Sequence, residues 1–92
     1  PSPGEVLRRY IIEGARITQE DLAAAMAVSR LTVNQLVNGK RTITAEMALR
    51  LARVLGTTPE FWLDLQRGVD LHGARKELTA KLNKMPVLRS AI

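Results

Sequence analysis

Hydrogen-bonding side chains gather on one face of the short segment SRLTVNQLVNGK, residues 29–40. A helix advances about 100° per residue, so the buried stripe of this segment is expected at Val33, Leu36 and Val37. The opposite face then carries Arg30, Leu31, Thr32, Asn34, Gln35 and Asn38. Asn and Gln can form two hydrogen bonds with adenine, Arg can do so with guanine, and an apolar group can contact the methyl of thymine. These residue types on one face indicate a surface that reads the base edges of DNA.

The alternative interpretation of this face is a plain solvated helix surface. A single exposed leucine such as Leu31 needs no special explanation, because much of any protein surface is apolar. A solvated face, however, ordinarily uses Lys and Glu rather than three amides around one leucine. The combination therefore favours recognition over solvation.

Two helices joined by a very short turn are expected to position this face. The first begins at Thr18 and ends near Ala27, and the second has Ser29 as its N-cap and closes at Asn38-Gly39. Such a pair forms a helix-turn-helix unit, whose second helix can enter a major groove. Helix pairs are common in any bundle, so the spacing alone is weak evidence for DNA binding.

Hydrogen-bonding groups and positive charge flank the helix pair. Gln19, Ser29 and the helix N-termini are suited to phosphate oxygens, and Lys40 and Arg41 add charge where a DNA backbone would run. The net charge is +5 with a pI near 10.5, and residues 29–59 hold five basic residues and one acidic residue. This balance fits a nucleic-acid partner, although charge alone fits a merely soluble basic surface equally well.

The pattern of apolar residues predicts five helices with short connections, and therefore an all-α bundle. Each predicted helix begins at a Ser or Thr N-cap, and these caps are Ser2, Thr18, Ser29, Thr44 and Thr58. In the first helix, over residues 3–13, the expected core stripe is Val6, Leu7, Tyr10 and Ile11, with Gly14 as its stop. Gly56 is expected to end the fourth helix, which begins at Thr44.

The end of the fifth helix is left open by Gly68 and Gly73. Residues 74–84 are compatible with a helix, and VLRSAI after Pro86 is compatible with a short strand, a tail or a partner-binding segment. The basic tail, residues 75–92, is expected to be solvated, or associated with a dimer through Leu78, Leu82, Val87 and Leu88.

Composition excludes several classes of function. The 92 residues suggest one domain. They include no cysteine, which removes disulfides and fits a cytoplasmic protein. No apolar run approaches the roughly 20 residues of a membrane span, and no secretory signal opens the chain. His72 is the one histidine, and with Asp64 and Asp70 it gives only a weak metal signal. We therefore expect no enzyme, metal, cofactor or small-molecule substrate.

One stretch, TQEDLAAAMAVSRLTVNQLVNGKR, resembles the helix-turn-helix of the phage-repressor-like (Cro/C1, or XRE) family. Ala27 departs from that family, which usually has Gly in the turn. Alanine is tolerated there if the backbone is not strongly left-handed, so the departure bears on the shape of the turn and not on the motif. SPGEVLRRYI and ITAEMALRLARVLGTTPEFWLDLQ resemble the HigA (VapI-type) antitoxins, and the resemblance then covers residues 2–71.

The resemblance implies a lambda-repressor-like helix-turn-helix domain over residues 1–71, with the unit itself at about 18–38 and a C-terminal extension over 72–92. It implies that the base readers are Arg30, Leu31, Asn34 and Gln35. It implies that the phosphate binders are Gln19, Ser29, Thr32, Asn38 and Lys40, and the charge of Arg41 places it with them. Candidates for dimer packing are Phe61, Trp62 and Leu65, for which burial inside the protomer is the commoner role.

The resemblance also implies a function and two protein partners. Proteins of this group are dimeric repressors of their own toxin–antitoxin operon, and a two-fold dimer reads a palindromic operator through two half-sites. They usually bind a RelE-like HigB toxin, an mRNA interferase whose catalysis belongs to the partner. The alternatives are a stand-alone XRE-family repressor without a toxin, and an interaction module in which DNA binding is secondary.

Overall fold

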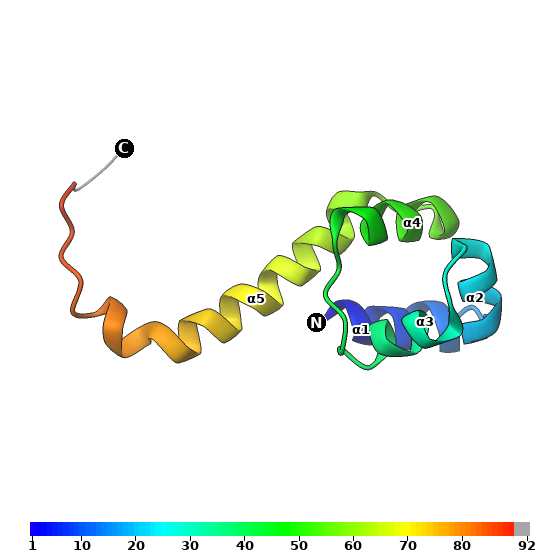
Figure 1. Ribbon diagram of the computed structural model, residues 1–92, viewed down its shortest axis with the longest axis horizontal. Coiled ribbons are helices and arrows are strands. Elements are labelled where there is room, and N and C mark those ends of the chain that lie inside the picture. The colour runs from blue at the N-terminus through cyan, green and yellow to red at the C-terminus, as the bar shows by residue number, and fades with distance from the viewer. Residues whose placement is uncertain (90–92) are drawn as a thin grey trace.

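The computed structural model describes residues 1–89 and contains only helices and connections over that range (Figure 1). The elements are α1 (Pro3–Val6), η1 (Leu7–Glu13), α2 (Gln19–Met26), α3 (Arg30–Val37), α4 (Ala45–Leu55) and α5 (Pro59–Leu82). The prediction of an all-α fold is confirmed. Of the segment VLRSAI, residues 87–89 form neither helix nor strand, and residues 90–92 lie outside the described residues.

The predicted helix caps are confirmed. At Ser2, Thr18, Ser29, Thr44 and Thr58 the hydroxyl accepts a hydrogen bond from the backbone N–H three residues on, at 3.0–3.2 Å. Gly39 and Gly56 both have φ of +69°, which glycine adopts without a steric penalty. Each Ser or Thr cap stabilises its helix by roughly 1 kcal/mol, so these short polar side chains set the helix boundaries.

One hydrophobic core joins α1 to the first turns of α5. Its largest fully buried side chains are Trp62, Leu7, Leu22, Leu36, Leu51 and Val33. The indole Nε1 of Trp62 donates to Thr57 Oγ1 at 2.7 Å, which satisfies the one polar atom that this ring brings into the core.

The first helix does not keep the predicted α-helical register. Its second part, η1, is a π-helix: the N–H of Gly14 donates to the carbonyl of Arg9, five residues earlier, at 3.1 Å. The wider turn rotates Tyr10 into solvent, where its side chain is 67% exposed. Ile11 packs against the core as predicted, and Ile12, which the predicted stripe did not include, packs there beside it. The prediction that Tyr10 is a core residue is therefore wrong, because the predicted core stripe assumed an α-helix with 3.6 residues per turn.

The turn between α2 and α3 is left-handed at Ala27, with φ 58° and ψ 43°. The shape of the turn, which the sequence left open, is therefore one that glycine adopts more readily than alanine. A side chain with a Cβ is disfavoured in this conformation by roughly 1–2 kcal/mol. Arg50 helps to fix the turn, because its Nη1 donates to the carbonyl of Met26 at 2.8 Å and so caps the end of α2.

α5 runs unbroken through Gly68 and Gly73 and ends at Leu82. The fifth helix, whose end the sequence left open, and the possible helix over residues 74–84 are therefore one helix. Its second half leaves the body of the molecule, and every described residue from Arg67 onward is exposed (Figure 1). The helix also crosses residue 71, the expected limit of the domain. Within the described residues, no helix combines the length and the apolar character that a membrane span requires.

Candidate nucleic-acid interface

The first helix holds α3 in place from behind. A Cβ on Gly4 would lie 2.6 Å from the carbonyl oxygen of Val37 and 2.8 Å from that of Leu36, so α1 approaches α3 as closely as a glycine permits. Arg8 Nη2 donates to the same Val37 carbonyl at 3.0 Å. Val33, with Leu36 and Val37, is buried beneath α3. The opposite face of α3 is therefore fixed and turned to solvent.

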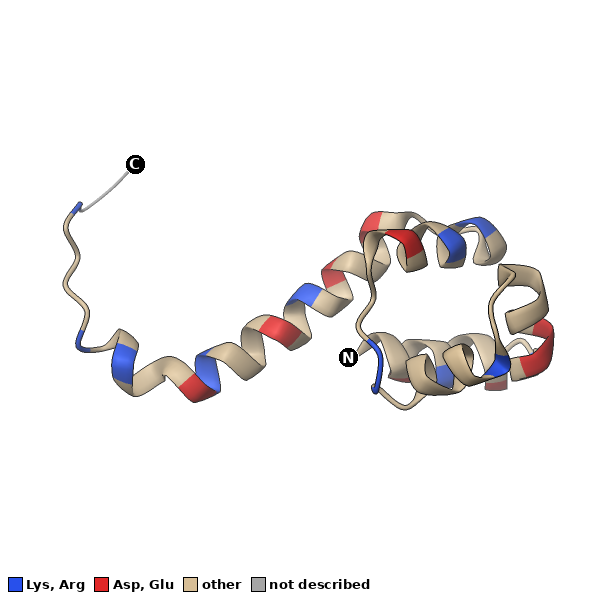
Figure 2. Ribbon diagram, in the orientation of Figure 1, with Lys and Arg blue, Asp and Glu red and all other residues tan. Residues whose placement is uncertain are grey.

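All four candidate base readers lie on that outer face. Arg30, Leu31 and Asn34 are exposed and Gln35 is half-buried, with Leu31 63% exposed among the polar groups. Figure 2 shows basic residues at both ends of α3 and acidic residues on the first turn of α2. The face thus combines hydrogen-bonding groups, one apolar contact and flanking positive charge, which is what a base-reading helix needs.

α2 contributes two side chains that hold this face. Arg30 Nη1 lies 2.8 Å from Glu20 Oε1, in an ion pair whose partners are both largely exposed. Asn34 Nδ2 donates to Gln19 Oε1 at 3.4 Å. Glu20 lies in the first turn of α2, where a carboxylate interacts favourably with the helix dipole. Its contact with Arg30 spans ten positions and depends on how the two helices cross, so no local signal predicted it.

The loop after α3 contributes a third contact. Arg41 Nε and Nη2 both donate to Gln35 Oε1, at 3.1 and 2.8 Å. Arg41 was expected to bind phosphate, and the structure places its guanidinium on a candidate base reader. Lys40 stands beside it, exposed on the same loop.

The remaining phosphate candidates also have structural duties. Ser29 Oγ caps α3 and shares a 2.9 Å hydrogen bond with Thr32 Oγ1. Asn38 Nδ2 donates to the Asn34 carbonyl at 2.9 Å near the other end of the helix. Gln19, Ser29 and Thr32 therefore lie toward the start of α3, and Asn38 and Lys40 lie beyond its end. Such an arrangement suits a duplex backbone that passes both ends of a recognition helix.

The three candidates for dimer packing make contacts within their own protomer. Trp62 is 0% exposed, so it offers no surface to a second copy and its proposed dimer role is wrong. Phe61 packs edge-on against Trp62, with ring centroids 5.1 Å apart, and remains 42% exposed. Leu65 is partly buried against the core. Trp62 is the residue at this junction that anchors α5 to α4.

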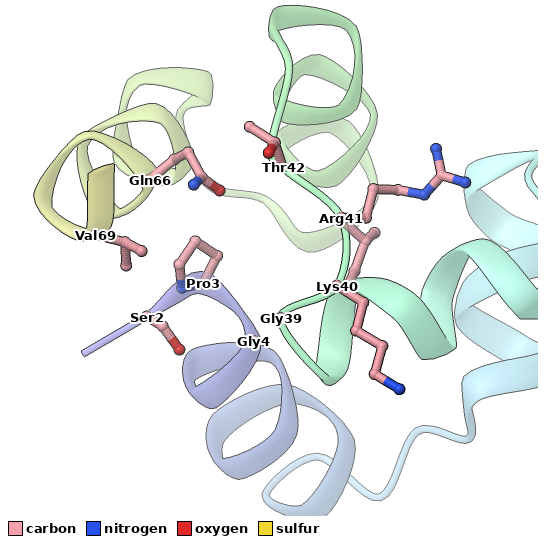
Figure 3. A pocket seen from close by; sticks show the side chains of 10 residues that line it. Ser2, Pro3, Gly4, Gly39, Lys40, Arg41, Thr42, Gln66 and Val69 are labelled. Atoms are coloured by element: carbon pink, nitrogen blue, oxygen red, sulfur yellow. The ribbon is translucent and has the colours of Figure 1, made fainter. Parts of the chain in front are cut away.

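A small cavity of about 200 Å³ lies where α1, the loop after α3 and α5 meet (Figure 3). Pro3, Gln66 and Val69 surround it, whereas Lys40 and Arg41 point away. Gln66 is engaged within the protein, because its Oε1 accepts from the N–H of Ile43 at 2.9 Å and its Nε2 donates to Asp70. The cavity is thus a packing feature that ties the loop to α5.

No metal centre is present in the described part of the chain. Residues 1–89 hold no group of three or more His, Cys, Asp or Glu side chains placed to bind a cation. His72 is exposed on the projecting part of α5.

Comparison with known proteins places this geometry in a family. The helix-turn-helix model HTH_3 matches residues 8–62. Antitoxin HigA-1 of Vibrio cholerae is 49% identical over 74 residues, which cover 80% of this chain and 70% of that protein. An HTH-type transcriptional regulator of Haemophilus influenzae is 46% identical over 70 residues, which cover 76% of this chain and 65% of the regulator.

The similarity extends to three dimensions. The structure of the Pseudomonas aeruginosa antitoxin HigA with the higBA promoter superposes with a TM-score of 0.90 at 34% identity, covering 97% of this chain and 98% of that one. The superposition includes the whole recognition unit and the projecting helix. The chain therefore belongs to the HTH_3, or XRE-type, helix-turn-helix family and, within it, to the HigA antitoxins.

Proposed function

We propose that this chain is a cytoplasmic, sequence-specific DNA-binding antitoxin. As a homodimer it binds a palindromic operator, represses its own toxin–antitoxin operon and neutralises a RelE-like HigB mRNA interferase. The observation that carries the proposal is the outer face of α3, with Arg30, Leu31, Asn34 and Gln35 on a helix that is packed firmly from behind. The likeness to a HigA antitoxin solved with promoter DNA supports the same assignment.

Base and backbone contacts divide along α3. Arg30, Leu31, Asn34 and Gln35 meet base edges in the major groove, where each good bidentate contact discriminates by about 1–3 kcal/mol. Gln19, Ser29, Thr32, Asn38 and Lys40 meet phosphates, which fix the register of the helix without carrying sequence information.

The second half of α5 supplies the dimer surface. Leu71 lies nine residues after Trp62, which at about 100° per residue puts it on the opposite side of the helix. Leu78 and Leu82 continue that exposed apolar stripe. Every described residue of this part of the helix is exposed, so no packing within the protomer supports it, and Gly68 and Gly73 each weaken it by about 1 kcal/mol relative to Ala. Packing of the stripe against a second copy stabilises it and sets the spacing of two recognition helices.

The operator test uses DNA from upstream of the operon that contains the chain's gene. The full-length protein should bind this DNA far more tightly than a scrambled duplex, with an affinity that falls steeply as salt rises, because phosphate contacts release counterions. Binding that does not distinguish the upstream DNA from the scrambled duplex, at any salt concentration, would refute the DNA-reading part of the proposal.

The toxin test uses the product of the adjacent gene. A small basic RNase encoded there should co-purify with this chain and lose its mRNA cleavage activity in the complex. An adjacent gene with no such product supports the alternative function, a stand-alone XRE-family repressor. The similarity to the Haemophilus transcriptional regulator favours keeping this alternative.

A further inference from the structure

We propose that Arg41 is a positioning residue that makes Gln35 select guanine rather than adenine in the operator. The inference rests on the proposed DNA-reading function and specifies one base of the site. Its basis is the contact of both Nε and Nη2 of Arg41 with a single atom, Gln35 Oε1.

The chemistry of the two side chains fixes the orientation of the Gln35 amide. A guanidinium has N–H donors and no acceptor, so the atom that faces it must be the carbonyl oxygen of the glutamine. That oxygen has two lone pairs, and Arg41 occupies both with N–H groups at 3.1 and 2.8 Å. Gln35 is left with the two N–H groups of Nε2 and with no free acceptor.

This orientation changes which purine Gln35 can read. The two-bond contact of Gln with adenine needs an N–H toward N7 and an oxygen toward the N6 amino group. With its oxygen occupied, Gln35 presents only donors, and the adenine amino group would meet another donor. Guanine presents two acceptors at these positions, N7 and O6, so an N–H of Nε2 can be accepted at either position and meets no opposing donor. The pair therefore favours guanine.

The loop geometry lets Arg41 serve this role while a neighbour meets the DNA backbone. Figure 3 shows Lys40 and Arg41 leaving the same loop on separate paths, both away from the cavity beneath it. Lys40 supplies a flexible point charge for phosphate, whereas the rigid guanidinium of Arg41 directs two N–H groups at the one oxygen of Gln35. Gln35 is half-buried on α3, which limits the freedom of its amide to turn away.

The test is the base preference of full-length protein selected on a library of random duplexes, followed by titration of single-base variants. The Gln35→Ala variant identifies the base pair at which preference disappears. At that pair the wild type should prefer guanine. Arg41→Ala should shift the guanine-to-adenine ratio of dissociation constants toward adenine by about tenfold. Arg41→Lys keeps the charge without the fork and should shift the ratio in the same direction.

Lys40→Ala is the matched control, because it removes a neighbouring charge of the same sign. It should weaken binding to every duplex and leave the base preference unchanged. The inference is overturned if the wild type prefers adenine at the Gln35 pair, if Gln35→Ala alters no preference, or if Arg41→Ala retains the wild-type ratio. A wild type that prefers no sequence at all would overturn the proposed function as well.

Discussion

The body of the chain, residues 1–66, contains the whole hydrophobic core, whereas every apolar side chain of residues 67–89 is exposed. In the body, α3 is held by a close glycine contact, by Arg8 and by a buried inner face. In the projecting part of α5, an apolar stripe faces solvent on the side away from the core. The difference separates two tasks: a base-reading surface needs side chains held within one protomer, and an assembly surface needs apolar area left for a partner.

The largest expected contrast is between an apolar residue of the body and one of the arm, by which we mean the projecting residues 67–89. Trp62→Ala should lower the free energy of unfolding by about 3–5 kcal/mol, because it empties the centre of the core. Leu78→Ala should change the intrinsic stability of the protomer by less than about 0.5 kcal/mol and should raise the dissociation constant of the dimer. Denaturant unfolding and sedimentation equilibrium measure the two quantities. An unchanged dimer constant in Leu78→Ala would contradict the assignment of the arm.

Two glycines extend the comparison. Gly4→Ala should destabilise the fold by about 1–3 kcal/mol, because its Cβ would press on two backbone carbonyls that cannot move aside. Gly68→Ala is the matched control in the arm, where nothing lies within 4 Å of an added Cβ. It should stabilise the helix by about 0.5–1 kcal/mol. Thermal unfolding of both variants tests the pair, and equal effects would show that α1 does not hold α3 as described.

A smaller effect, a gain in stability, is expected from a substitution at the turn between α2 and α3. Ala27→Gly should raise the free energy of unfolding by about 1 kcal/mol, because glycine adopts the left-handed backbone of this position without strain. DNA affinity should be unchanged if the turn already has its final shape. A destabilised Ala27→Gly protein would mean that the turn is not left-handed in solution.

The smallest effect concerns the ion pair at the edge of the interface. Glu20→Gln removes a carboxylate that neutralises Arg30 and repels phosphates. Affinity for scrambled DNA should rise a few-fold, and affinity for the operator should rise less, so that discrimination between the two duplexes falls. The effect is small because an exposed ion pair of this kind contributes about 0.2–1 kcal/mol. Anisotropy titrations with both duplexes measure the change. Asp21→Gln, one residue along α2, is the matched control for the loss of one charge.

Short-range signals explain what the sequence predicted well. Ser29 and Thr44 each cap a helix by bonding a backbone group three residues away, and Gly39 and Gly56 each supply a local left-handed residue. Both effects lie within one helical turn and can be recognised without knowing the fold. The outward position of Leu31 follows from helical periodicity for the same reason.

Features that depend on packing escaped prediction. Tyr10 turns outward because η1 widens its turn, and Ala27 becomes left-handed because the two helices must meet at that angle with Arg50 capping the first. The pairing of Glu20 with Arg30 needs the α2–α3 crossing. The contacts of Arg50 and Glu20 join different helices, which composition and periodicity do not record. The hydrogen bonds of η1 are local, but a stripe drawn for an α-helix does not anticipate them.

The Gln35→Ala variant shows whether the outer face of α3 reads bases. The measurement is the ratio of dissociation constants for scrambled and operator duplexes at one fixed salt concentration, in the wild type and the variant. In Gln35→Ala we expect this ratio to fall by a factor of about 5 to 150, equivalent to about 1–3 kcal/mol, through weaker operator binding and unchanged binding to scrambled DNA. An operator preference equal to that of the wild type would contradict it.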